Sequence, residues 1–84
     1  MEEQEIGVVD HFFGKISVGM IKLSGALKVG DTIHIKGKQA DFSQEIESMR
    51  IGFEDVTEAK EGDKVGVKVA QPLHANDKVY KVIE

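Results

Sequence analysis

Apolar and polar residues alternate along most of this chain in short runs, a pattern typical of β-strands. Ile33 and Ile35 fall on one side of such a run and His34 on the other, because successive side chains of a strand point to opposite faces. The run from Val65 to Val69 alternates in the same way. No stretch sustains the i, i+3, i+4 apolar spacing of a helix. The pattern predicts strands over residues 6–13, 16–23, 32–36, 42–53, 64–69 and 78–83.

The longest predicted strand contains a change of phase. Phe42 and Ile46 share one parity, whereas Met49 and Ile51 take the other. A β-bulge near Ser48 would produce this shift and bend the strand, as a small barrel requires. Six or so short strands separated by turn signals indicate an antiparallel barrel or a sandwich. We favour one all-β domain over residues 1–84, a small closed six-stranded antiparallel β-barrel, because closure removes edges that would pair with other chains.

Length and composition narrow the class of protein. The 84 residues allow one domain, and the absence of cysteine excludes a disulfide framework and a thiolate metal site. The net charge of −4 disfavours a protein that coats nucleic acid. No apolar stretch approaches the roughly 20 residues of a membrane span, and the first residues are acidic where a secretory signal is basic. We therefore expect a soluble, cytoplasmic protein with no membrane partner.

Candidate chemistry is sparse. The three histidines, His11, His34 and His74, lie far apart in the sequence. There is no His-x-x-x-His pair, no calcium-loop spacing and no glycine-rich phosphate-binding motif. We expect no catalytic residue, no metal site and no cofactor, and therefore no GTP binding by this chain alone.

A non-enzymatic binding surface is the stronger hypothesis. If Phe12 and Phe13 occupy successive strand positions, one of them must face outward unless a bulge intervenes, and an exposed aromatic is a good anchor for a partner. Basic residues on the barrel could lie beside it, but acidic residues are interleaved with them and most of the four Phe are expected in the core. RNA binding is therefore left open. The candidate partner-binding residues are His11, Phe12, Phe13, Lys36, Lys38 and Arg50.

Three motifs carry a resemblance to a known family. The run Gly25 to Ile35 (GALKVGDTIHI), the run Gln44 to Met49 (QEIESM) and the run Lys60 to Val67 (KEGDKVGV) resemble the β-barrel second domain of translational GTPases of the elongation factor Tu type. The resemblance implies a six-stranded antiparallel barrel with Greek-key elements. It also implies a protein or ribonucleoprotein partner of the translation apparatus.

A similar barrel is appended to the C-terminus of collagenase-like peptidases, where it is a non-catalytic accessory. The main hypothesis is therefore a stand-alone, translation-factor-like binding module. The alternative is an accessory or structural subunit of a larger complex or peptidase, with no RNA binding. Because fold does not determine function, the sequence leaves both hypotheses open.

Overall fold

All regular structure in the described part of the chain is β-strand. The computed structural model describes residues 2–38, 41–52 and 54–83. The strands are β1 (Glu2–Phe13), β2 (Val18–Leu23), β3 (Leu27–Lys28), β4 (Thr32–Lys36), β5 (Asp41–Glu45), β6 (Met49–Ile51), β7 (Glu54–Val56), β8 (Glu58–Ala59), β9 (Lys64–Lys68) and β10 (Lys78–Ile83). These residues include no helix long and apolar enough to cross a membrane. The predicted all-β class is confirmed.

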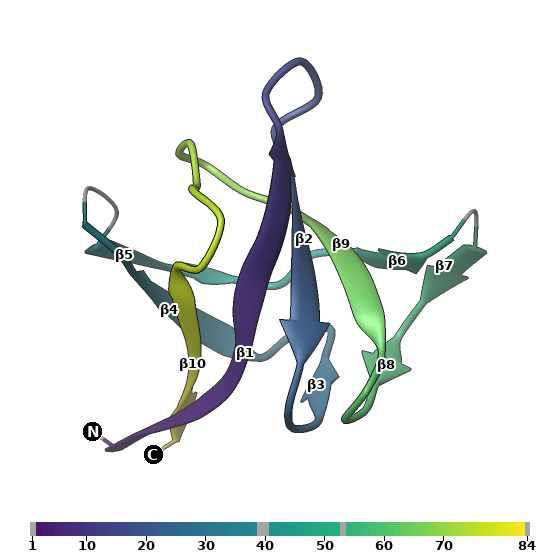
Figure 1. Ribbon diagram of the computed structural model, residues 1–84. Helices are drawn as coiled ribbons and strands as arrows, with labels where there is room; N and C mark the ends of the chain where they lie inside the picture. Colours follow the sequence, from purple (N-terminus) through teal and green to yellow (C-terminus); the bar gives the residue numbers. More distant parts are fainter. Residues whose placement is uncertain (1, 39–40, 53, 84) are drawn as a thin grey trace.

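The strands form one large antiparallel sheet and one small one. Eight strands are hydrogen-bonded in the order β5-β4-β10-β1-β2-β9-β6-β7, and β3 pairs with β8. Figure 1 shows the large sheet curving strongly around its interior, with the two ends of the chain side by side. Strand β1 lies between β10 and β2, and its register shifts between Glu5 and Gly7 and again between Val9 and His11. Such bulges bend a strand, and here they let β1 follow the curve of the sheet.

The closed barrel predicted from the sequence is wrong. The large sheet begins at β5 and ends at β7, and no backbone ladder between described residues joins these two strands. The predicted strand over residues 42–53 is in fact two strands, β5 and β6, which lie far apart in the sheet order. The break between β5 and β6 begins at Ile46, whose N–H donates to Asp31 O at 2.8 Å and whose carbonyl accepts from Gly30 N at 2.9 Å. These bonds hold the end of β5 against the turn before β4, where the Ile46 side chain is buried, and the chain passes to β6 through residues 46–48, which belong to no strand.

One side chain connects two separated parts of the sheet. The amide nitrogen of Gln44 on β5 donates to Lys68 O at 2.8 Å, and its amide oxygen accepts from Ala70 N at 2.9 Å. A glutamine amide offers the same donor and acceptor as a peptide group. Gln44 therefore links β5 to the end of β9 in place of a backbone ladder.

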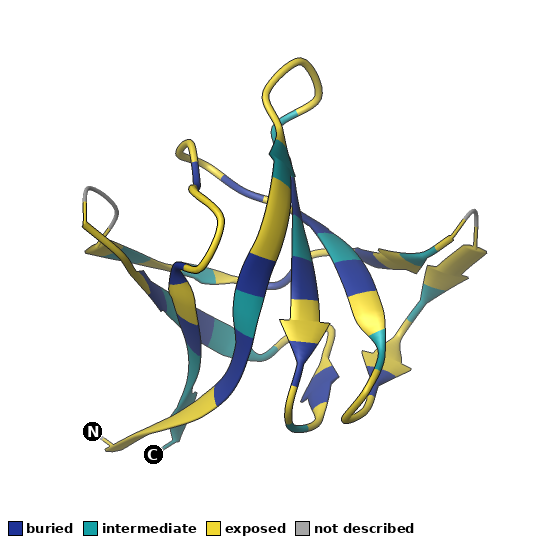
Figure 2. Ribbon diagram, in the orientation of Figure 1, coloured by how far each residue is buried: buried dark blue, intermediate teal, exposed yellow. Residues whose placement is uncertain are grey.

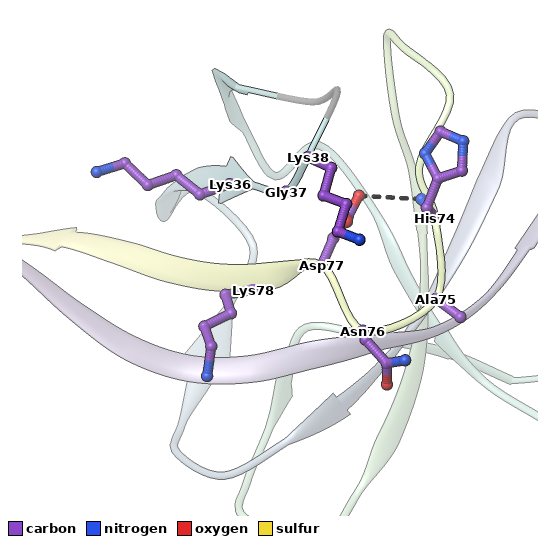
Figure 3. A pocket seen from close by; sticks show the side chains of 8 residues that line it. All are labelled: Lys36, Gly37, Lys38, His74, Ala75, Asn76, Asp77 and Lys78. Atoms are coloured by element: carbon purple, nitrogen blue, oxygen red, sulfur yellow. Dashed lines mark hydrogen bonds between the residues drawn. The ribbon is translucent and has the colours of Figure 1, made fainter.

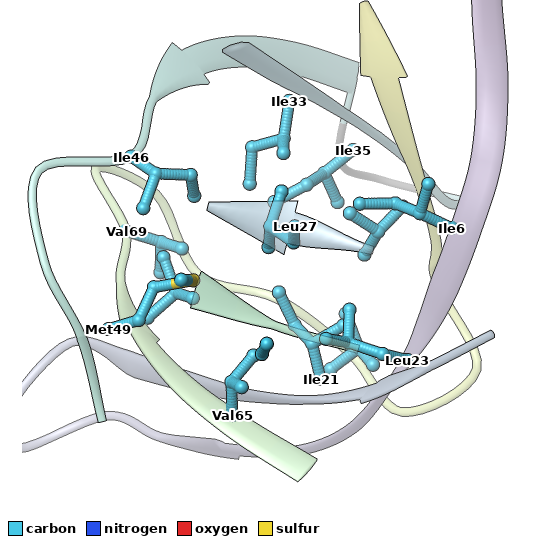
Figure 4. Packing of buried hydrophobic residues seen from close by; sticks show 14 of the residues in the cluster. Ile6, Ile21, Leu23, Leu27, Ile33, Ile35, Ile46, Met49, Val65 and Val69 are labelled. Atoms are coloured by element: carbon cyan, nitrogen blue, oxygen red, sulfur yellow. The ribbon is translucent and has the colours of Figure 1, made fainter. Parts of the chain in front are cut away.

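The core is aliphatic. Figure 2 shows buried and exposed bands alternating along β1, β2 and β9, and Figure 4 places Leu27 in the middle of the labelled core side chains, so that the short strand β3 helps fill the interior. Ile33 and Ile35 are fully buried, as their alternation predicts. The expectation that most Phe lie in the core is wrong for the three described here. Phe12 and Phe42 only pack against the core from its margin, Phe13 is exposed, and Phe53 lies outside the described residues.

Candidate binding groove

The six candidate residues do not form one site. Four of the candidates are divided between two open hollows of similar size, about 610 and 600 Å³. Lys36 and Lys38 line the first hollow, and Phe13 and Arg50 line the second. His11 lies beside Phe13, with the ring centroids 4.7 Å apart in an edge-to-face arrangement. Phe12 points to the other side of β1 and packs against the core. We call the first hollow the lysine cleft and the second the apolar groove.

The lysine cleft is formed by the turn after β4 and the turn before β10, and two of the three lysine side chains that line it diverge. Figure 3 shows Lys36 and Lys78 pointing away from each other. The Lys78 ammonium lies 3.5 Å from a Glu5 carboxylate oxygen, and that of Lys36 lies 5.8 Å from the centre of the Tyr80 ring. The buried carboxylate in this cleft, Asp77, accepts a bond from the His74 main-chain N–H at 3.0 Å. This arrangement stabilises a turn and gathers no cations around a ligand.

The apolar groove is formed by two rows of side chains that cross the outer face of the sheet. Directly paired residues of neighbouring strands present their side chains on the same face. The first row runs across five strands as His11, Met20, Gly66, Arg50 and Asp55. The second row runs across three strands as Phe13, Val18 and Lys68. The hairpin after β1 adds Ile16, so that the groove has an aromatic and aliphatic end and a polar end.

A glycine lies in the floor of the groove. Gly66 lies between Met20 and Arg50 in the first row. A Cβ atom built on Gly66 would lie 3.3 Å from Val18 Cγ1 and 3.4 Å from Met20 Sδ. Any larger residue at position 66 would therefore press against these side chains.

The apolar end of the groove is open to solvent. Phe13 is 44% exposed and Ile16 is 61% exposed, and they are two of the three large hydrophobic residues that the structure records as exposed. At the polar end, Arg50 Nε donates to Asp55 Oδ1 at 3.0 Å. Lys68 forms no ion pair with any residue in the described ranges. The groove thus joins an exposed apolar surface to a positively charged rim.

Sequence reasoning did not assign Ile16, Val18 and Met20 to a site, although a signal was present. These residues share one parity on β2 and the hairpin before it, while Ile21 and Leu23 share the other and are buried. A strand that covers a core on one face and meets water on the other is expected to alternate apolar with polar residues. Apolar residues on both faces of one strand therefore indicate that the outer face is suited to contact another apolar surface.

A second polar cluster lies on the outer face of the other half of the sheet. His34 on β4 lies between two carboxylates, with Nδ1 2.6 Å from Glu3 Oε2 and Nε2 2.5 Å from Asp41 Oδ1. The hydrogen bonds to Asp41 and then to Glu3 raise the pKa of His34 above 6.5, and the bond to His34 lowers the pKa of Asp41. Because the two carboxylates bond to opposite nitrogens of the ring, they lie on opposite sides of it and cannot coordinate the same metal ion. The described residues contain no group of His, Asp and Glu placed to hold a metal.

This cluster predicts a pH dependence of stability. A raised pKa in the folded state gives stabilisation that is complete below the unfolded value of 6.5 and is lost as the pH rises through the folded value. The urea concentration at the midpoint of unfolding is therefore expected to decrease as the pH is raised above 6.5, and His34→Gln should remove this decrease. His11→Gln, at an exposed position without carboxylate partners among the described residues, serves as the control that keeps it. An identical pH profile for wild type and His34→Gln would contradict the assignment.

Comparison with known proteins relates the chain to peptidases. It is 44% identical over 81 residues to the uncharacterized protease MJ0090 of Methanocaldococcus jannaschii, an alignment that covers 95% of this chain and 20% of the protease. Its fold matches the crystal structure of the C-terminal domain of a "putative U32 peptidase" of Geobacillus thermoleovorans, with a TM-score of 0.89 at 19% identity over 95% of this chain and 93% of that one. The selenomethionine variant of that domain matches with a TM-score of 0.86. No family model matches the sequence.

These similarities correct the resemblance to elongation factors. The homologues are a protease and the C-terminal domain of a peptidase, so the assignment to the second domain of translational GTPases is wrong. The translation-factor-like and RNA-binding character that came with it is wrong for the same reason. The alternative hypothesis, an accessory module associated with a peptidase, is consistent with these relatives. The chain spans one fifth of the length of its curated relative.

Proposed function

We propose that this chain is a non-catalytic accessory domain of a peptidase, which contacts the peptidase polypeptide and does not itself cleave peptide bonds. The alignment with the M. jannaschii protease carries the proposal, because it covers nearly all of this chain but only a fifth of the protease. A domain that corresponds to so small a part of an enzyme is expected to assist the larger part and not to carry the catalytic centre itself. The match to a solved C-terminal domain supports a unit that folds as a domain of its own.

The arrangement of titratable side chains agrees with a non-catalytic role. His34 lies on the outer face of the sheet with both ring nitrogens bonded to carboxylates. His74 lies in a turn of the lysine cleft, and His11 contacts Phe13 edge-to-face beside the apolar groove. These three imidazoles are therefore on separate surfaces, whereas a proteolytic centre needs a base beside its nucleophile or metal.

A chimera tests this proposal. In the M. jannaschii protease, the segment of 81 aligned residues is replaced by this chain, and the chimera is compared with the intact protease and with a version that lacks the segment. We expect the chimera to match the intact protease in thermal unfolding and in resistance to limited proteolysis, while the shortened version is less stable. We also expect the isolated chain to release no new peptide termini from denatured proteins, as read by mass spectrometry. Cleavage by the isolated chain, or a chimera no better than the shortened version, would overturn the proposal.

A further inference from the structure

The apolar groove has the composition of a docking surface. Val18 and Met20 face outward from β2 and are only partly buried, and Phe13 and Ile16 stand exposed at their end. Exposed aromatic and aliphatic side chains around a recess are typical of the centre of a protein interface. Gly66 lines the floor of the groove between Met20 and Arg50, and the Val18 and Met20 side chains lie close over it.

We infer that this groove holds a segment of the peptidase polypeptide that presents an apolar side chain next to an acidic one. The apolar side chain packs against Val18 and Met20, beside the exposed Phe13 and Ile16. The acidic side chain faces Lys68, which the described residues leave without a carboxylate partner, and Arg50. This inference rests on the proposed function, because the partner is the part of the peptidase outside this domain.

Two observations favour that occupant over a second copy of the chain. The relative has four fifths of its length outside the aligned segment, so a domain of this kind has a large polypeptide to contact. A two-fold contact through the groove would instead place the same surface of each copy against the other. The carboxylate among the described residues that line the groove is that of Asp55, which already accepts from Arg50, so a second copy would offer Lys68 no free carboxylate.

The experiment measures binding of this chain to the M. jannaschii protease that lacks its aligned segment, by isothermal titration calorimetry. Two groove variants are used: Ile16→Asp places a charge in the hairpin at the apolar end, and Gly66→Val fills the floor. Val29→Asp is the matched control, since Val29 is the third exposed large hydrophobic residue in the described ranges and does not line the groove. We expect each groove variant to weaken binding by roughly tenfold or more and the control by less than about twofold.

Two charge-reversal variants test whether the partner presents an acidic side chain to the rim of the groove. Lys68→Glu at the rim is expected to weaken binding by roughly tenfold, and the same change at Lys28, an exposed residue of β3 away from the groove, by less than about twofold. Circular dichroism of every variant confirms that the strands are retained. The same variants are placed in the chimera, where loss of thermal stability reports loss of docking if the two separate chains bind too weakly to measure.

The outcomes separate this inference from the proposed function. If the groove variants bind the shortened protease, or stabilise the chimera, to the same degree as wild type, the assignment of the groove as the docking site is overturned while the accessory role stays intact. A wild-type chain that neither binds the shortened protease nor stabilises the chimera would overturn both. A mass in sedimentation that rises with concentration, and returns to the monomer value in Ile16→Asp, would assign the groove to a second copy and also overturn the inference.

Discussion

Replacing Ile35 with alanine is expected to lower the free energy of unfolding by about 3–4 kcal/mol, within the usual range for removing a buried Ile side chain. Ile35 is fully buried on β4 and pairs with Val79 on one side and Phe42 on the other. Because these neighbours belong to separate strands of a curved sheet, they cannot close over the missing atoms without moving the backbone. A domain of 84 residues has a total stability of roughly 4–13 kcal/mol, so this single change removes a large share of it.

Urea unfolding followed by circular dichroism measures this loss, and the midpoint is expected to fall by roughly 2 M or more. Val29→Ala is the control, since Val29 is 37% exposed and its truncation should change the free energy by less than about 0.5 kcal/mol. Equal midpoints for the two variants would show that Ile35 does not lie in the core.

The strands that could be predicted from the sequence are those with one buried face. The predicted ranges 32–36 and 78–83 coincide with β4 and β10, because alternation at Ile33 and Ile35 and the turn before Lys78 define their limits. The break between β5 and β6 could not be predicted in this way. It depends on hydrogen bonds between Ile46 and the turn at Gly30 and Asp31, which are distant in the sequence. Alternation reports which side of a strand is buried and carries no information about which strand is its neighbour.

Two of the three motifs behind the elongation-factor resemblance have a local explanation. Gly30 and Gly62 each take a positive φ, and each is followed by an Asp whose carboxylate accepts the main-chain N–H three residues earlier, at 3.0 Å from Lys28 and 3.1 Å from Lys60. Glycine tolerates this backbone conformation and Asp stabilises the turn. The residues of both motifs are therefore those that one kind of turn requires. Such turns recur in unrelated β-proteins, so the motifs could predict β-turns but could not identify a family.

The candidate site was predictable only in part, because it depends on which strands are neighbours. Phe13 and Arg50 line the same groove, but they are brought together by β2, β9 and β6 lying side by side. The same topology places Lys36 and Lys38 in a different hollow. Gly66 acquires its role only when Met20 and Arg50 flank it across the sheet. Residue type could indicate which side chains are suited to binding, and strand order decides which of them meet.

Gly37→Ala is expected to lower the free energy of unfolding by about 2–4 kcal/mol, although it adds a single methyl group at the end of β4. The new Cβ atom would lie less than 3 Å from three atoms of the Asp77 carboxyl group, and its two nearest contacts would overlap outright. Asp77 is only 5% exposed and its carboxylate accepts the His74 N–H at 3.0 Å. The collision can be relieved only by moving this carboxylate, which breaks the bond that stabilises the turn before β10. Urea unfolding of the variant measures the loss, with Gly14→Ala as the control, since a Cβ there meets only Phe12 Cε2 at an ordinary 3.7 Å.

A double-mutant cycle identifies the cause of that loss. In the background of Asp77→Ala, the carboxyl group that the new methyl group would strike is absent, so Gly37→Ala should cost less than about 1 kcal/mol there. Asp77→Asn retains an oxygen and the size of the side chain, and in that background the full cost should persist. If Gly37→Ala were equally costly in all three backgrounds, the glycine would be required for its backbone conformation and not for the approach of Asp77. A small cost in the Asp77→Ala background alone would establish that the turn after β4 and the turn before β10 are held together by this contact.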